Sequence, residues 1–350
     1  MLVNRTGAVA TLVATLAMST LVVTAGPAAA VNGTAAPSGT AAQATVTGVH
    51  NTYNNPTFPF LAQALDAGTG MIELDTWTDV FTQEWKVSHD SPTSNKNNCV
   101  NAAAPADLYT GGANKDLGSC LDDVRVWLTA HPTAGPLFIK VEMKAGFEAN
   151  LGMGPSQFDS VVNSHLGSTL FRPANLLGGF PTLDAAAKAD AWPTRAALAG
   201  KAVVYIIPGT VELANPFTPV HSDIVYGTYV KNLAASGNLA QASTFPAVLG
   251  AAAGDPRTKF GDTTIRPWFV FFDGDAATYV NGIDTSFYDT NHYILTMTDA
   301  QNVTPALNDT NPAVADAQAR VAQLAKDHAS IVSNDWGGLP GVLGEVLPRG

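Results

Sequence analysis

Short, continuous runs of apolar and β-branched residues recur along the chain. Stretches with helical spacing, or rich in Pro and Gly, separate them. Because the runs do not alternate with polar residues, each is typical of a strand buried on both faces, as in a parallel sheet. The runs predict eight strands: Thr45–Val49, Met71–Trp77, Trp85–Ser88, Leu137–Met143, Ala202–Ile207, Trp268–Phe272, Tyr293–Met297 and Ile331–Ser333.

Helical patterns lie between these runs, over Leu121–Ala130, Pro155–Ser164 and Pro312–His328. Strands that alternate with helices form parallel βαβ units, and eight of them in one chain favour a (β/α)8 (TIM) barrel over an open sheet. An open dinucleotide-binding sheet is excluded because no G-x-G-x-x-G follows the first strand. The second and third runs are too close for a helix between them. We therefore expect α/β architecture in a single, irregular barrel over residues 45–350.

The N-terminal segment has the pattern of a secretory signal peptide. Asn4-Arg5 precede an apolar stretch, and Ala28-Ala29-Ala30 offer small residues for cleavage near Ala30. A membrane anchor is the competing interpretation, but the stretch is short for the ~20 residues of a span. We predict a signal peptide over 1–30, a flexible tether over 31–44, and a secreted mature protein without a transmembrane segment.

Charged residues make up 13% of the chain, about half the usual ~25%, and the net charge is -11. A chain with 46% hydrophobic residues is not expected to be disordered. An acidic protein without a run of basic residues is not expected to bind nucleic acid. Cys99 and Cys120 are the two cysteines. In an exported protein they are expected to form a disulfide, although two free thiols or half of a metal site are the alternatives.

Polar side chains lie on or directly after the first four predicted strands. They are two histidines, three carboxylates and one amide: His50, Asn51, Glu73, Asp75, His89 and Glu142. A lone acid at a strand end more often caps a loop, and a lone histidine is usually a core group. However, barrel strands end at one mouth, where catalytic residues lie. Several such groups on separate strands therefore favour a functional site.

Glu73 and Asp75 are two positions apart on one strand, so both side chains face the same side. Two carboxylates held close together raise the pKa of one of them unless a cation neutralises the pair. Carboxylate and amide oxygens suit a hard cation, so Asn51, Glu73, Asp75 and Glu142 predict a Ca²⁺ site, with Mg²⁺ as the alternative. The set suits zinc poorly because it contains no thiolate.

Four segments together resemble the catalytic barrel of the phosphoinositide-specific phospholipases C. Gly48-Val49-His50-Asn51-Thr52-Tyr53 is similar to that family's "SHNTY" segment, and Glu73-Leu74-Asp75-Thr76-Trp77 is similar to its "ELDCW" strand. Val87-Ser88-His89-Asp90 takes the place of its second histidine, and Val141-Glu142 that of its last acidic ligand. The order agrees throughout, and the secreted, single-domain, calcium-dependent bacterial members are the most similar.

The resemblance implies Ca²⁺ on the four oxygen ligands, with His50 and His89 as the acid–base pair. It implies cleavage of phosphatidylinositol, or a related inositol lipid at a membrane surface, to diacylglycerol and an inositol phosphate. An inositol hydroxyl would attack phosphorus, by way of a cyclic phosphate. Lys140 and Lys144, which flank Glu142, are candidate substrate-binding residues. We expect a monomer.

Three other functions compete with this interpretation. A glycerophosphodiester phosphodiesterase uses a similar barrel, but its first strand typically ends in His-Arg, whereas Asn51 follows His50 here. A glycoside hydrolase would need a second carboxylate at working distance from Glu142. A non-catalytic surface-binding barrel would have no use for two histidines beside a metal site.

Overall fold

The computed structural model describes residues 1–2, 38–218 and 220–350. The predicted signal peptide, 1–30, and residues 31–37 of the predicted tether lie outside these ranges, apart from the first two residues. In the described part of the tether, Ala41–Gln43 form a 3-10 helix in which Ala41 and Ala42 are buried, and Ala44 begins the first strand. The packed structure therefore starts before residue 45.

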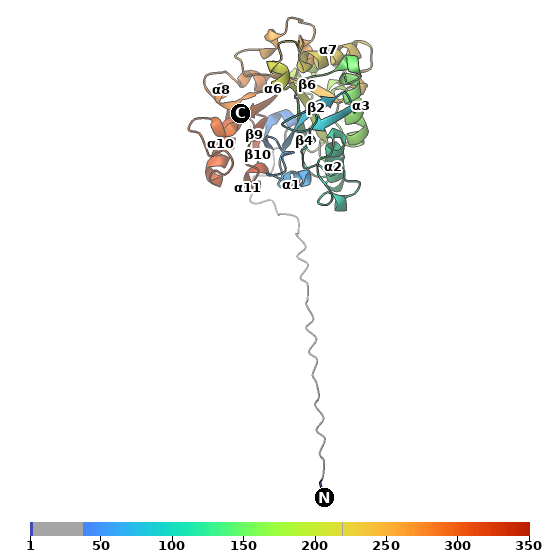
Figure 1. Ribbon diagram of the computed structural model, residues 1–350. Helices are drawn as coiled ribbons and strands as arrows, with labels where there is room; N and C mark the ends of the chain where they lie inside the picture. Colours follow the sequence, from blue (N-terminus) through green and yellow to red (C-terminus); the bar gives the residue numbers. More distant parts are fainter. Residues whose placement is uncertain (3–37, 219) are drawn as a thin grey trace. The chain divides into compact units, whose positions relative to one another are not determined.

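Eight parallel strands close into a barrel (Figure 1). The circle closes because β1 pairs in parallel with both β2 and β9. This confirms the predicted TIM-barrel fold. In order around the barrel, the strands are β1 (Ala44–Val49), β2 (Met71–Asp79), β4 (Leu137–Met143), β5 (Ala202–Pro208), β6 (Thr244–Leu249), β7 (Phe271–Asp275), β8 (Ile294–Thr298) and β9 (Ile331–Asn334).

Two strands differ from the sequence prediction. The run at Trp85–Ser88 is not a barrel strand: β3 (Glu84–Val87) pairs antiparallel with β2 as a hairpin beyond the barrel. This is why no helix fits between the two. The missing barrel strand is β6, where Pro246 interrupts the apolar run and argues against a strand in the middle of a sheet.

Helices of varied length connect the strands. The long ones are α2 (Leu117–Ala130), α3 (Pro155–Leu166), α7 (Ser222–Ala235) and α10 (Val314–Lys326). The short ones are α1 (Leu61–Asp66), α4 (Pro173–Leu177), α5 (Leu183–Lys188), α6 (Thr210–Ala214), α8 (Ala276–Val280), α9 (Ser286–Thr290) and α11 (Pro340–Leu343). A last strand, β10 (Val346–Pro348), pairs antiparallel with β1. Within the described ranges, no helix has both the length and the apolar character needed to cross a bilayer.

The predicted disulfide is present between Cys99 and Cys120, and both cysteines are fully buried. It ties the long connection after β3 to the first turns of α2. The Asp116 side chain caps this helix by accepting a hydrogen bond from the backbone N–H of Ser119 at 2.8 Å. The chain between the β2–β3 hairpin and α2 is thereby held against the barrel.

Candidate active site

The barrel interior is layered because side chains two positions apart on a strand share a face. Near the start of the strands, aromatic side chains fill the barrel interior, and the ring centroids of Phe138 and Phe271 are 6.3 Å apart. Two residues further along the same strands, these positions are Lys140 and Asp273. Charged groups thus begin one layer below the mouth.

Glu73, Asp75 and Glu142 come together at the mouth end of β2 and β4. Asp75 and Glu142 are register partners, and the three carboxylates offer oxygen atoms that all lie within 4.8 Å of one another. The ammonium of Lys144 lies 3.1 Å from Asp75 and 3.0 Å from Glu142. Burial, together with the charges of Glu73 and Glu142, raises the pKa of Asp75 to about 7. One lysine does not offset the repulsion within this cluster.

Lys140 lies beneath this cluster, with its ammonium 3.1 Å from Glu73 and 3.3 Å from Asp273. Burial alone would raise the pKa of Glu73, but Lys140 and then His50 outweigh it and lower that pKa. Burial raises the pKa of Asp273 to about 6. Lys140 and Lys144, the predicted substrate-binding lysines, are both buried against carboxylates and contribute to the charge balance of the interior.

The carboxylate cluster fits a hard cation. Both oxygens of Asp75 are buried and receive no hydrogen bond of ordinary geometry from the described residues. Glu142 uses Oε1 for its contacts with Lys144 and with the N–H and hydroxyl of Thr210, so Oε2 has no hydrogen-bond partner among the described residues. Several carboxylate oxygens gathered in one place, with one ammonium between them, offer the kind of ligand set that Ca²⁺ binds.

A tight turn after β1 places His50 and Asn51 beside Glu73. The Thr52 hydroxyl donates to the carbonyl of Val49 at 2.5 Å and accepts from the backbone N–H of Glu73 at 3.1 Å. Asn51 has a positive φ of 50°, a conformation that asparagine tolerates better than most residues. Its backbone N–H donates to Glu73 at 3.3 Å. The turn therefore joins the predicted amide ligand to the carboxylates.

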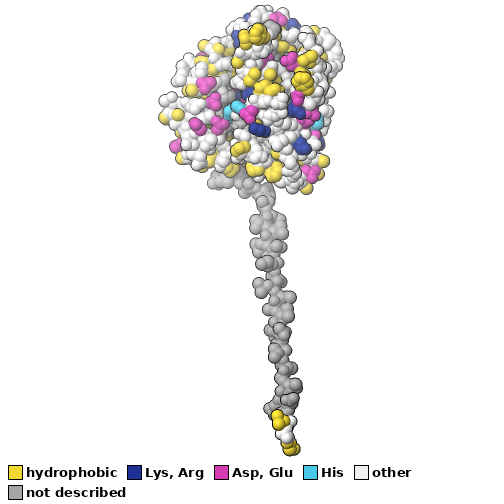
Figure 2. All heavy atoms as spheres, viewed as in Figure 1, with side chains coloured by type: hydrophobic (Ala, Val, Ile, Leu, Met, Phe, Trp, Pro, Cys, Tyr) yellow, Lys and Arg dark blue, Asp and Glu magenta, His cyan; other side chains and the backbone are white. Residues whose placement is uncertain are grey.

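His50 is held from the other side by the end of β9. Its Nδ1 is 2.9 Å from Asp335, whose second oxygen accepts from Gln301 Nε2 at 2.9 Å. The opposite ring nitrogen lies 3.9 Å from Glu73. Burial would lower the pKa of His50, but the hydrogen bond to Asp335 and the charge of Glu73 raise it to about 9. In Figure 2, histidine and acidic side chains lie together near the centre of this face.

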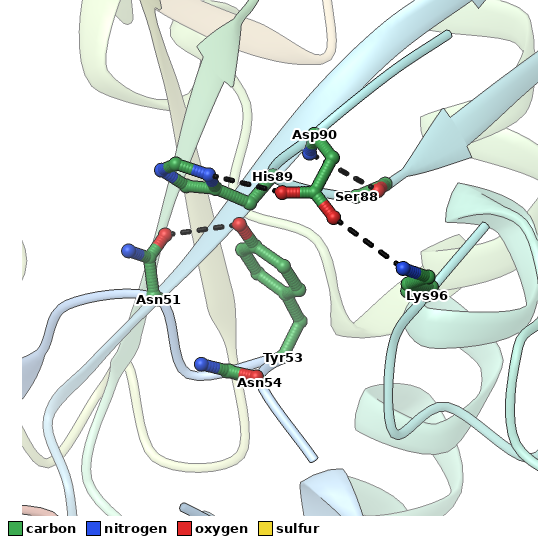
Figure 3. Close-up of a pocket in the computed structure, with 7 residues that line it drawn as sticks. All are labelled: Asn51, Tyr53, Asn54, Ser88, His89, Asp90 and Lys96. Carbon is green, nitrogen blue, oxygen red and sulfur yellow. Dashed lines mark hydrogen bonds and ion pairs between the residues drawn. The ribbon is translucent and has the colours of Figure 1, made fainter. Parts of the chain in front are cut away.

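His89 reaches the mouth because β3 runs back toward it. The N–H of Ser88 donates to the carbonyl of Asp75, so the residue after it stands level with the carboxylates. His89 is exposed and lies 3.6 Å from Asp90. Figure 3 shows His89 and Asn51 facing one hollow, with the Tyr53 hydroxyl donating to the side-chain oxygen Oδ1 of Asn51 at 3.0 Å. Ser88, Asp90, Lys96 and Asn54 complete its lining.

Sequence reasoning missed the polar groups of the second half of the barrel. Asp273 lies in the middle of β7, one layer below the mouth, whereas Asp299 follows β8 and Asp335 follows β9 at the mouth. Oxygens of Asp299 and Asp335 and a ring nitrogen of His50 lie within 4.8 Å of one another. The same signal that identified the first four strand ends, a polar residue where an apolar run ends, is present here. The prediction did not include these later strand ends.

These features define a (β/α)8-barrel enzyme with histidines and buried carboxylates gathered at one mouth. Neither a protein-family model nor a curated protein matches the chain. Among solved structures, a Ca²⁺-dependent phosphatidylinositol-specific phospholipase C from Streptomyces antibioticus is 49% identical with a TM-score of 0.87. The match covers 89% of this chain and 99% of that one.

A calcium-dependent phosphoinositol-specific phospholipase C from a Pseudomonas species shares the fold at 19% identity. Its TM-score is 0.66, over 89% of this chain and 96% of that one. The identity to the Streptomyces enzyme, over nearly its whole length, is decisive. The chain belongs to the family of calcium-dependent phosphatidylinositol-specific phospholipases C, which are phosphoric diester hydrolases.

The contact between His50 and Asp335 generates a pH prediction. Because the folded-state pKa of about 9 lies above the ordinary 6.5, the contact stabilises the fold fully below about pH 6.5. Its contribution is lost as the pH rises through about 9. A proton NMR titration of the metal-free protein should give His50 a pKa near 9, and Asp335→Asn should lower it by at least ~1 unit. An unchanged pKa in the variant would contradict the assigned contact.

Proposed function

We propose that this chain is a secreted, Ca²⁺-dependent phospholipase C that cleaves phosphatidylinositol to diacylglycerol and an inositol phosphate. The observation that carries the proposal is the 49% identity to a Streptomyces enzyme of this kind, over 89% of the chain. His50, Asn51, Glu73, Asp75, His89 and Glu142 lie around one mouth, which supports it further.

In this proposal, Asn51, Glu73, Asp75 and Glu142 hold Ca²⁺ through oxygen atoms. When bound, the ion supplies positive charge that lowers the pKa of an attacking hydroxyl and neutralises the phosphoryl oxygens. The chain prepares this place by burying carboxylates without matching hydrogen bonds. Lys140 fixes Glu73 from below, and the Asn51 backbone fixes it from the side.

His50 acts on the phosphodiester as a positioned cation. Asp335 accepts from Nδ1, and Nε2 points toward Glu73 and the mouth, 3.1 Å from the side-chain amide nitrogen of Asn51. A pKa raised to about 9 keeps the ring protonated at neutral pH, so Nε2 donates a hydrogen bond to a phosphoryl oxygen. Charge that develops on this oxygen in the transition state strengthens the bond.

His89 is the general acid in this scheme. It is exposed on the hollow that Asn51 and Tyr53 also line, so a leaving group can reach its ring from solvent or from a lipid surface. An imidazole can deliver a proton near neutral pH. His89 would protonate the oxygen of diacylglycerol as its bond to phosphorus breaks, and the carboxylate of Glu73 or Glu142 would accept the proton of the attacking inositol hydroxyl.

The substrate we propose is phosphatidylinositol without further phosphates. The two interior lysines are paired with carboxylates, and among the described residues Lys96 is the only lysine or arginine that lines the hollow. A headgroup with additional phosphates would require more cationic groups. The similarity to the Streptomyces enzyme favours this function over a glycerophosphodiester phosphodiesterase, a glycoside hydrolase or a non-catalytic barrel.

A phosphorus NMR assay on phosphatidylinositol vesicles tests the proposal. With Ca²⁺, the purified protein should release water-soluble inositol phosphate, and a calcium chelator should reduce the rate by at least ~100-fold because the phosphoryl charge loses its counter-ion. Added Ca²⁺ should restore the rate. No release with Ca²⁺, or release of glycerol phosphate from glycerophosphoinositol instead, would contradict it.

The two histidines can be tested separately from the metal. His50→Ala and His89→Ala should each lower the turnover number by about 10²- to 10⁴-fold, as expected when one acid–base group is removed. His131→Ala is the matched control, because His131 follows the last residue of α2, stacks on Trp127 and does not line the hollow. Full activity in either test variant would remove that residue from the mechanism, while a similar loss in the control would point to general damage.

A further inference from the structure

The hollow beside His89 has a polar lining. Its lining residues come from the turn after β1, from the end of β3 and from the connection that follows: Asn51, Tyr53, Asn54, Ser88, His89, Asp90 and Lys96. Tyr53 supplies the one aromatic ring among them, and its hydroxyl donates to Asn51. Hydrocarbon against such a wall would leave polar groups unpaired, so the hollow suits a ligand that forms hydrogen bonds.

Asp90 lies between the two basic side chains of the hollow (Figure 3). One of its oxygens is 3.6 Å from Nδ1 of His89, and the other is 3.6 Å from the ammonium of Lys96. Because this carboxylate offsets the charge of Lys96 and repels anions, the hollow is a poor place for a second phosphate group. Hydrogen-bond donors remain in the ammonium of Lys96 and the side-chain amide of Asn54. The hollow therefore suits an uncharged group that carries oxygen acceptors.

The segment that carries Lys96 is fixed to both other walls of the hollow. Directly after it, the side-chain amide of Asn97 donates to the carbonyl of Val87 at 3.0 Å, at the end of β3. The side-chain amide of Asn98 donates to the carbonyl of Thr52 at 3.0 Å, in the turn after β1. Both asparagines are buried, and the disulfide follows them directly. Because its backbone is held in this way, the hollow is preformed for a ligand.

The hollow also lies on the leaving-group side of the proposed reaction. There, His89 protonates the oxygen that leaves phosphorus, and Asn51 marks the side of the candidate metal ligands. The attacking and leaving oxygens of a phosphoryl transfer lie on opposite sides of phosphorus. With inositol on the metal side, the leaving group therefore extends past His89 toward Asp90 and Lys96. The part of diacylglycerol next to the leaving oxygen is its glycerol portion, which carries uncharged oxygen acceptors.

We propose that this hollow is the subsite for the glycerol portion of the leaving group, and that Lys96, with Asn54, selects this portion by hydrogen bonds to its oxygen atoms. The inference rests on the proposed function for its substrate class, and it adds to that function the recognition of the leaving group. Acyl chains take no part in this recognition. Glycerophosphoinositol, the same diester without acyl chains, should therefore occupy the subsite.

Two water-soluble diesters that differ only in the leaving group test the subsite. Glycerophosphoinositol and n-propyl phosphoinositol have the same three-carbon leaving chain, but only the first carries oxygens beyond the scissile bond. Lys96→Met should lower the ratio of their kcat/KM values by about tenfold, because a charge-assisted hydrogen bond to glycerol is lost. Effects on the chemistry at phosphorus cancel in this ratio. The Lys96 side chain is 77% exposed, so the fold should tolerate the substitution.

Lys115→Met is the matched control, because Lys115 lies on the same connection, is exposed and does not line the hollow. An unchanged ratio in Lys96→Met, or an equal change in the control, would overturn the inference and leave the proposed function intact. If the wild type cleaves neither diester nor phosphatidylinositol, the proposed function fails, and saturation-transfer NMR then decides on the subsite. Transfer to the glycerol protons of glycerophosphoinositol that weakens in Lys96→Met would support it, and no transfer would overturn it.

Discussion

Neutralising the carboxylates inside the barrel mouth is the constraint on which the rest of this structure depends. Glu73, Asp75, Glu142 and Asp273 share two ammonium groups, those of Lys140 and Lys144. A buried charge without a partner costs several kcal/mol, so the two excess negative charges need protons or a divalent cation. Protons neutralise part of this excess charge, because the pKa values of Asp75 and Asp273 rise to about 7 and 6. A single bound calcium ion would neutralise both excess charges.

The same arrangement divides the mouth by chemistry. On the side of β1 and β9, Asp335 orients His50 and raises its pKa, which keeps the ring protonated, and acidic side chains make this side polar. On the side of β2, β4 and β5, backbone groups of α6 brace the carboxylate cluster, and the exposed side chains are apolar. The two sides of the mouth therefore differ in chemistry: one carries acidic side chains around a protonated His50, and the other is apolar.

The sequence predicted the barrel and the first half of its mouth because apolar runs and the polar residues on or after them are local signals. His50, Glu73, Asp75 and Glu142 could be found in this way. Pro246 concealed β6, and the antiparallel hairpin of β3 looked like a barrel strand because both have the same composition. The pairing of Lys140 with Asp273 joins strands that are distant in sequence, and a local pattern carries no information on such a contact. Asp335 was missed because the strand ends were not followed to β9.

Isothermal titration of the metal-free protein with Ca²⁺, in two buffers of different ionisation enthalpy, tests the central claim most directly. The account predicts one ion per chain, and proton release at about pH 6 that largely disappears at about pH 8, because Asp75 is protonated below its pKa of about 7. Asp75→Asn should abolish most of the proton release and weaken binding. Failure to bind Ca²⁺, or binding with the same affinity and no proton release at both pH values, would contradict it.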